Sequence, residues 1–440
     1  MSGGDTDGPR KLGLPMATAL VVGSMVGSGV FLLPAQLAPF GWNSVVAWAI
    51  TISGALMLAV VISRLTRALP AAGGPIGIVS HMFGPFAATL IGWSTWVSYW
   101  TAVATLAIAA TSYFSIFVPA LATSRTLATV ANMAIIGVIT LLNLRGARAS
   151  GGFQLLTTIL KLMPLVAVVI ILAVLGAKGS MPVTKFPADG LSLAAITTAA
   201  SLTLWALVGF EAVGLASDKI DRPEINVGRA TVIGTALTGI IYIIVCSGIL
   251  LTLPQATLAA SNAPFSLFIE TYWSRDAALA IAAFAAISAI GAMNGFILIQ
   301  GEIPLTMARK GLLPDWFGKT NAAGTPVRMQ IISSLFACAL VLFNSSKSLG
   351  SLFSFMALLS TSATLWLYLA LAASALRLGI AKALAVVGGL YALWTLWGAG
   401  IDASGLSLVL MLTALPMYFW MRRRATSPVP SSSAEARSGS

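Results

Sequence analysis

Charged side chains are scarce in this sequence. Only 9% of its 440 residues are Asp, Glu, Lys or Arg, and 58% are hydrophobic, whereas a soluble domain carries about 25% charged residues. This excludes an ordinary soluble protein and predicts an integral membrane protein that crosses the lipid bilayer many times. The net charge of +12 does not indicate a nucleic-acid partner, because nearly all Lys and Arg residues lie in the predicted loops, where they set membrane topology.

The groups that carry enzyme or metal chemistry are also scarce. The two cysteines, Cys246 and Cys338, lie in separate apolar runs and are expected to be packing residues rather than a disulfide or metal ligands. The one histidine, His81, falls in a predicted loop. No nucleophile–base pair or cluster of metal ligands is visible in the sequence. We therefore expect a protein that is not an enzyme, with no catalytic residues, no metal and no cofactor.

Long apolar runs make up most of the chain. Windows of about 20 apolar residues, the length that crosses a bilayer, predict an all-α protein with twelve transmembrane helices. The predicted spans cover residues 15–40, 44–63, 84–118, 127–144, 153–176, 192–217, 228–253, 273–308, 329–345, 349–376, 381–398 and 404–421.

Lys and Arg are distributed unequally over the predicted loops. If the N-terminus lies inside, 19 of them fall in cytoplasmic segments and five in outer segments, which supports this orientation and an even number of spans. We therefore expect a multi-pass protein of the cytoplasmic (inner) membrane with both termini in the cytoplasm. Residues 1–12 form the expected N-terminal tail, residues 13–422 a single transmembrane domain and residues 423–440 a disordered tail.

Glycine interrupts two of the spans near their centres. In the first span the interruption is Gly27-Ser28-Gly29, and in the sixth it is the run from Gly209 to Gly214. Glycine costs about 1 kcal/mol against alanine inside a helix. Unpaired backbone groups in hydrocarbon are costly too, so a break is tolerated where the freed N–H and C=O groups line a cavity and bind a ligand. The alternative is that these small residues only allow helices to pack closely.

The two interrupted spans begin two successive blocks of five spans, at about residues 15–176 and 192–376, and two extra helices follow at 381–421. Because five is odd, the second block enters the membrane with the opposite polarity. Broken helices in corresponding positions of inverted repeats are typical of the binding site of a secondary transporter. The sequence therefore predicts a substrate site near the bilayer midplane, between the two breaks.

The backbone groups freed by the two breaks have opposite polarity. The half-helix that follows the first break offers N–H groups and a positive dipole end, which suit a carboxylate, and Ser28 can add a hydroxyl donor. The half-helices that end near Met25 and between Trp205 and Val208 offer carbonyls that suit an ammonium group. One site that binds both groups predicts recognition of an α-amino acid.

Three ionisable residues fall well inside the predicted spans: Lys161, Glu211 and Glu302. Such residues are costly in a membrane and indicate function by default. Lys161 could donate to broken-helix carbonyls in place of a sodium ion, or titrate, and snorkelling to the interface is the alternative. Glu211 could carry a proton or hold the unwound segment together, and Glu302 suits an ion pair or a gate contact. Trp205, directly before the second break, is a candidate for a ring that closes over a substrate.

Five motifs along the chain carry a family resemblance. They are Gly27-Ser28-Gly29-Val-Phe-Leu-Leu-Pro34-Ala, Trp205-(x)3-Gly209-Phe-Glu211, Arg222-Pro223-Glu224, Ala308-Arg309-(x)-Gly311-Leu312-Leu313-Pro314 and Gly324-Thr325-Pro326-Val327. Together they resemble the amino acid–polyamine–organocation (APC) superfamily from about Lys11 to about Trp420. Within it the chain looks closest to the basic amino acid/polyamine antiporter branch, whose best-known type is the arginine/agmatine antiporter.

The resemblance implies a LeuT-like fold of five-plus-five inverted repeats, with helices 1 and 6 broken at the midplane and two extra helices at the end. Substrates of the family bind between spans 1, 3, 6, 8 and 10. The implied binding groups are Ser28 and Gly29 for the carboxylate and the carbonyls of Met25, Trp205 and Val208 for the ammonium.

The resemblance also implies roles for three side chains. Trp205 would be a gate that stacks on the substrate, and Glu211 would be a second gating residue. Lys161 matches a lysine that many superfamily members place where sodium-coupled relatives bind sodium, although the arginine/agmatine type typically lacks it.

The far end of the predicted site departs from the arginine/agmatine type. Phe296 stands where that branch has a tryptophan over the guanidinium, and it offers a weaker cation–π face. Tyr99 and Ala104 replace a small residue and a polar amide on the third span. These changes remove side-chain groups that recognise guanidinium and leave main-chain recognition of an amino acid intact. Tyr99, Ala104 and Phe296 complete the predicted substrate-binding residues.

These features predict a secondary active transporter of amino acids or related amines that works by alternating access. Sodium-independent exchange is the first hypothesis, and proton-coupled amino-acid uptake is the alternative. A membrane sensor built on a transporter fold is less favoured, because no signalling domain is expected in the two short tails. The resemblance leaves both a monomer and a homodimer open.

Overall fold

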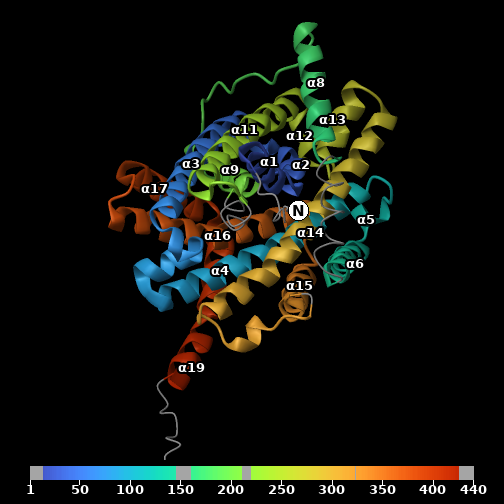
Figure 1. The fold of residues 1–440 in the computed structure, drawn as a ribbon. Helices are drawn as coiled ribbons and strands as arrows, with labels where there is room; N and C mark the ends of the chain where they lie inside the picture. The colour runs from blue at the N-terminus through green and yellow to red at the C-terminus, as the bar shows by residue number, and fades with distance from the viewer. Residues whose placement is uncertain (1–12, 145–159, 211–219, 323, 426–440) are drawn as a thin grey trace, which may run out of the picture.

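The computed structural model describes residues 13–144, 160–210, 220–322 and 324–425, and within them every regular element is a helix (Figure 1). The α-helices are α1 Leu14–Met25, α2 Ser28–Leu37, α3 Trp42–Ala68, α4 Pro75–Phe114, α5 Ala120–Thr123, α6 Arg125–Leu144, α8 Met163–Ala177, α9 Leu193–Leu207, α11 Pro223–Thr252, α12 Gln255–Ala259, α13 Pro264–Tyr272, α14 Arg275–Arg309, α15 Val327–Phe343, α16 Leu349–Leu378, α17 Lys382–Gly398, α18 Gly400–Leu412 and α19 Leu415–Ala425. Short 3-10 turns cover Ala38–Phe40, Pro70–Ala72 and Asp315–Gly318.

Seven of the described segments are long and apolar enough to cross a membrane unaided. They are α3, α4, α6, α11, α14, α16 and the stretch Gly400–Arg423 that joins α18 to α19. The bent pair α1 and α2 makes an eighth. The shorter helices α8, α9, α15 and α17 overlap the remaining predicted spans. The all-helical membrane fold is therefore confirmed, while the count of twelve crossings stays a prediction.

Two parts of the helix pattern differ from the prediction. The third span was expected to begin at residue 84, but α4 begins at Pro75 and continues for 40 residues through a kink. Gly84 makes the kink with φ 80°, a value that favours glycine, and Pro85 follows it as the first residue of a new helical turn. The short helices α12 and α13, between α11 and α14, were not predicted.

Several helix ends follow directly from the local sequence. Ser192, Ser274 and Ser348 are the N-caps of α9, α14 and α16, and each hydroxyl accepts a hydrogen bond from the backbone N–H three residues later. Gly379 ends α16 in the left-handed conformation at φ 74°, and its N–H donates to the last turn of the helix.

The long helices form two packed groups (Figure 1). In the first group α4 packs along both α16 and α14, and α6 and α15 cover α14. In the second group α11 packs against α3 and α1, and α3 packs against α9. The half-helix α2 contacts both groups, through α11 and α9 on one side and α4 on the other.

Buried amide side chains connect the helices of the first group. Asn143 Nδ2 on α6 donates to Asn294 Oδ1 on α14 at 2.9 Å, and Gln300 Nε2 on α14 donates to Ser334 Oγ on α15 at 2.9 Å. Such buried networks restrict how helices can slide past each other. These hydrogen bonds should hold α6, α14 and α15 in fixed positions relative to one another, and the first group is called the frame below.

Candidate functional site

The first predicted break is present, one to two residues earlier than expected. The helix α1 ends at Met25, and α2 begins at Ser28 with Gly27 as its N-cap. Val26 has φ −71° and ψ 92°, and Gly27 has φ −129° and ψ −148°, so neither is helical. The two half-helices are bent by 46°. Gly29 thus already belongs to the first turn of α2 instead of forming the interruption.

The start of α2 presents unpaired backbone donors. The first four N–H groups of an α-helix have no acceptor within that helix, and the N–H groups of Ser28 and Gly29 are among them. The N-cap Gly27 has no side chain that could accept from them. These are the two residues predicted to bind a carboxylate, and for Ser28 only the backbone is described.

The second predicted break begins where α9 ends. Leu207 is the last helical residue, Val208 is extended with φ −62° and ψ 137°, and Gly209 has φ 114°. Only glycine adopts this last value without strain, which explains why a glycine stands here. Glu211, the second predicted gating residue, lies outside the described residues.

The two breaks contact each other directly. Ser24 Oγ, one residue before the end of α1, lies 3.0 Å from the carbonyl oxygen of Gly209 and 2.8 Å from that of Val21, and it can donate to either. On the other side of the break, a Cβ on Gly29 would lie 3.1 Å from Ala206 Cα on α9. The ends of the two interrupted helices therefore form one continuous structure.

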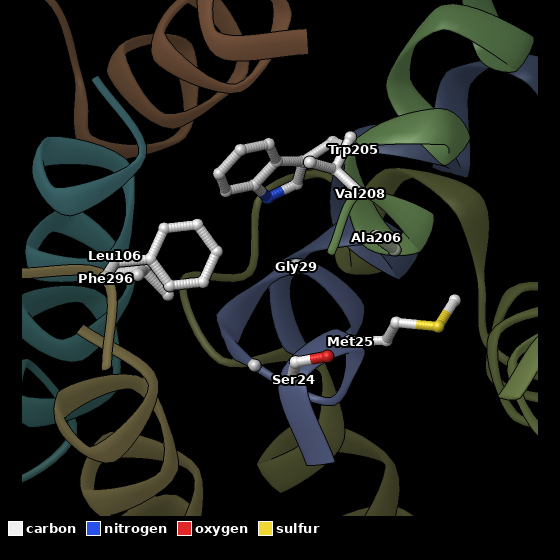
Figure 2. A pocket seen from close by; sticks show the side chains of 9 residues that line it. Ser24, Met25, Gly29, Leu106, Trp205, Ala206, Val208 and Phe296 are labelled. Carbon is white, nitrogen blue, oxygen red and sulfur yellow. The ribbon is translucent and has the colours of Figure 1, made fainter. Parts of the chain in front are cut away.

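A small cavity of about 20 Å³, which has room for about one water molecule, lies at this junction (Figure 2). Its walls come from α1, α2, α4, α9 and α14. The lining residues are Ser24, Met25, Gly27, Gly29, Leu106, Trp205, Ala206, Val208 and Phe296. None of these nine side chains is ionisable, and no group of three or more His, Cys, Asp or Glu that could hold a metal is found among the described residues.

Five of the eight predicted substrate-binding residues line this cavity: Met25, Gly29, Trp205, Val208 and Phe296. The start of α2 carries the sixth, Ser28. The remaining two lie behind the wall.

Tyr99 packs its ring on Phe296, with centroids 5.2 Å apart, and is 5% exposed. Ala104 is fully buried on α4 and does not line the cavity, whereas Leu106, two residues later, does. Because residues two apart on a helix do not share a face, the part of α4 that lines the cavity lies on the other side of the helix from Ala104.

Four lining residues were not among the predicted substrate-binding residues, although Gly27 belongs to the predicted first break and Ala206 to the predicted end of the sixth half-helix: Ser24, Gly27, Leu106 and Ala206. A hydroxyl one turn before a helix break is a signal that could have indicated Ser24. Leu106 and Ala206 carry no comparable signal, because they are apolar residues in apolar helices.

Two carbonyl groups, one at the first break and one within α2, accept hydrogen bonds from tyrosines that the sequence did not predict. The Tyr242 hydroxyl on α11 donates to the Met25 carbonyl at 2.9 Å, and the Tyr113 hydroxyl on α4 donates to the Phe31 carbonyl at 2.7 Å. Both tyrosines are fully buried. A carbonyl oxygen has two lone pairs, so Met25 keeps one acceptor position beside its bond to Tyr242.

Lys161 lies in the turn that precedes α8 and is 1% exposed. Its ammonium donates a hydrogen bond to the carbonyl oxygen of Gly23, two residues before the end of α1. This contact joins the region of the predicted fifth span to the first break.

Comparison with known proteins identifies the family of this chain. The amino acid permease family matches residues 12–430. The chain belongs to this family. The permease is 28% identical over 342 residues to the cadaverine/lysine antiporter of Escherichia coli (strain K12). The matched region covers 76% of this chain and 74% of the relative. It is 30% identical over 401 residues to a putative arginine/ornithine antiporter of Bacillus subtilis (strain 168), covering 84% and 85%. It is 28% identical over 408 residues to the putrescine transporter PotE of Haemophilus influenzae, covering 90% and 93%.

These relatives confirm the predicted membership of the APC superfamily and of its basic amino acid/polyamine antiporter branch. The permease is a multi-pass membrane transporter and not an enzyme.

Proposed function

We propose that this permease exchanges amino acids or related amines across a bacterial inner membrane, independently of sodium and by alternating access. The observation that carries the proposal is the junction of the two helix breaks around one buried cavity. Backbone groups freed inside a membrane are tolerated where they line a cavity and bind a ligand. The names of the relatives, which include a lysine, an arginine/ornithine and a putrescine transporter, favour amino acids and amines as that ligand.

In this proposal the backbone recognises the invariant part of an amino acid. The N–H groups of Ser28 and Gly29 bind the carboxylate at the positive end of α2. The carbonyls of Met25, Trp205 and Val208 bind the ammonium. The closeness of these groups supports the assignment, since Gly29, Met25, Trp205 and Val208 all line the same cavity.

The opposite wall would select the substrate side chain. Phe296 and Leu106 come together there (Figure 2), with Tyr99 behind Phe296. This wall offers apolar contact and one aromatic face, which attracts a cation through its ring quadrupole. Ala104, on the other side of α4, would act through the packing of that helix and not by contact with the substrate.

Lys161 supports independence from sodium. Its ammonium already donates to the Gly23 carbonyl beside the first break, so a fixed protein cation would do there what a bound sodium ion does in sodium-coupled transporters. The same residue favours the alternative of proton-coupled amino-acid uptake, because a buried lysine that contacts the moving helix could release its proton during the cycle.

Alternating access would move α1, α3, α9 and α11 against the frame of α4, α14 and α16. The two packed groups described above support this division, as does the proposed five-plus-five inverted repeat, in which α1 and α9 begin the two repeats. Trp205, at the end of α9, would close the cavity, and Glu211 stays a proposed second gate.

Counterflow in proteoliposomes tests the proposal. Purified protein is reconstituted, the vesicles are loaded with one unlabelled amino acid or polyamine at a time, and uptake of the labelled compound is followed with sodium or with choline outside. We expect internal substrate to accelerate uptake equally in both solutions. If the uptake rate does not depend on internal substrate but rises with an imposed pH gradient, the protein is a proton symporter and not an exchanger. If uptake requires external sodium, sodium independence is refuted.

A further inference from the structure

Trp205 carries a buried hydrogen-bond donor without an acceptor. The residue is 5% exposed, and its indole Nε1 has no hydrogen-bond partner. Buried polar groups are almost always paired, so each exception calls for an explanation. Two other described tryptophans, Trp48 and Trp100, share this property, but only Trp205 lines the cavity.

The orphan donor lies beside the start of α2. A Cβ on Gly29 would be 3.1 Å from both Nε1 and Cδ1 of Trp205. Figure 2 shows the indole ring beside the cavity with its nitrogen on the side that faces Gly29. The indole N–H on α9 therefore lies beside the first turn of α2, whose backbone N–H groups have no acceptor within that helix.

The neighbouring N–H donors of Trp205 and α2 indicate which chemical group of a ligand could bind there. A carboxylate only accepts hydrogen bonds and has about four acceptor positions, so it can bind backbone N–H groups and an indole N–H together. A helix N-terminus also attracts negative charge. Since no side chain that lines the cavity is ionisable, these N–H groups are the lining groups suited to recognising an anion.

We propose that Trp205 donates its indole N–H to the carboxylate of a bound amino acid, alongside the backbone N–H groups that begin α2. The proposal rests on the proposed function and adds a task to the ring beyond stacking and closure. It makes Trp205 a specificity residue that distinguishes an amino acid from its decarboxylation product, because an amine without a carboxylate cannot accept this hydrogen bond.

The test removes the N–H and keeps the ring. Trp205 is replaced by 3-benzothienylalanine, in which sulfur takes the place of the indole N–H, through nonsense suppression. Dissociation constants are measured in detergent for three pairs that differ only in the carboxylate: lysine and cadaverine, ornithine and putrescine, leucine and isopentylamine. The matched control is Trp100→Phe, which removes a buried orphan indole on α4 away from the cavity.

We expect the analogue at position 205 to weaken binding of the amino acid about 10- to 100-fold, the loss typical of one hydrogen bond to a charged group. Binding of the matching amine should change less than about twofold, and Trp100→Phe should leave both unchanged. Equal losses for amino acid and amine would assign the ring to stacking alone and overturn the proposal. Unchanged amino-acid binding, or a wild-type protein that binds amines alone, would overturn it too.

A second replacement at position 205 distinguishes loss of the hydrogen bond from a folding defect. Ring-fluorinated tryptophan at position 205 keeps the shape of the side chain, makes the N–H a stronger donor and weakens the π face. The proposal predicts amino-acid binding equal to or tighter than in the wild type, whereas a stacking role predicts weaker binding of both compounds. If the wild-type protein shows no counterflow of any amino acid or amine, the proposed function itself fails, and this result is distinct from those above.

Discussion

The contact between Gly29 and α9 gives the sharpest prediction. An added Cβ at position 29 would lie 3.1 Å from Ala206 Cα and 3.1 Å from two atoms of the Trp205 ring, a separation tighter than nine in ten real Cβ contacts. The Trp205 ring could turn away, but Ala206 Cα is backbone and can move only with the end of α9. Gly29→Ala should therefore separate the two broken helices.

The magnitude follows from the cost of overpacking. Inserting a methyl group into a close-packed contact costs about 1–3 kcal/mol, and every 1.4 kcal/mol is tenfold in an equilibrium constant. If closure of α9 over α2 accompanies binding, Gly29→Ala should raise the dissociation constant of the best substrate about 5- to 150-fold. Binding of labelled substrate to the detergent-purified protein measures this directly, and counterflow should fall in parallel.

Gly137→Ala is the matched control. Gly137 lies within α6, and a Cβ there would meet no atom within 4 Å, so this variant should bind and exchange as the wild type does. Gly29→Ala with an unchanged dissociation constant would show that α2 and α9 do not close on each other when substrate binds. That result would refute the reasoning from the junction of the breaks, whatever the substrate is.

Three further variants probe the surroundings of the cavity. Ser24→Ala removes the hydroxyl that reaches the Gly209 carbonyl and should weaken substrate binding about 2- to 10-fold, the worth of one hydrogen bond; an unchanged dissociation constant would mean that this bond does not hold the breaks together. Lys161→Met keeps an unbranched chain but removes the hydrogen-bond donor to the Gly23 carbonyl. Either the proton concentration that gives half-maximal exchange or the dissociation constant of the substrate should change about tenfold, which corresponds to about 1.4 kcal/mol. If neither changes, Lys161 has a structural role. Phe296→Trp offers a better cation–π face and should tighten arginine binding about 2- to 5-fold relative to leucine, as measured by competition; equal effects on both would show that the ring contributes only apolar contact.

The positions of the breaks could be predicted because backbone chemistry leaves a mark in the sequence. The φ of 114° at position 209 requires a glycine. Gly27 is the N-cap of α2, where it offers no side chain to its first N–H groups. The prediction erred by placing the first break at the whole Gly27-Ser28-Gly29 run. Gly29 has a different task, which is to let Ala206 and Trp205 approach closely. Glycine is suited to both tasks, and composition alone cannot separate them.

The side-chain wall could not be predicted in the same way. In α4 nearly all residues from Ser94 to Tyr113 are buried, so the helix has no polar face that fixes its rotation. Its orientation depends on packing against α16 and α14, which the hydrophobic pattern of α4 does not reveal. For this reason Leu106 and not Ala104 lines the cavity. The partner of the Tyr242 hydroxyl was hidden for the same reason, since only the fold brings α11 to the carbonyl of Met25.

The resulting site divides recognition between two kinds of structure. Apart from the Trp205 indole, the groups assigned to the amino and carboxyl ends of a substrate are backbone groups, and three side chains bond to carbonyls at or near the breaks: Tyr242 at Met25, Ser24 at Gly209 and Lys161 at Gly23. Substitutions in the apolar wall leave these contacts unchanged, so the wall can vary and alter the preferred side chain without disturbing the breaks. Substitutions behind the breaks would instead weaken every substrate together. A variant series that separates these two outcomes therefore maps which contacts select the substrate and which ones build the site.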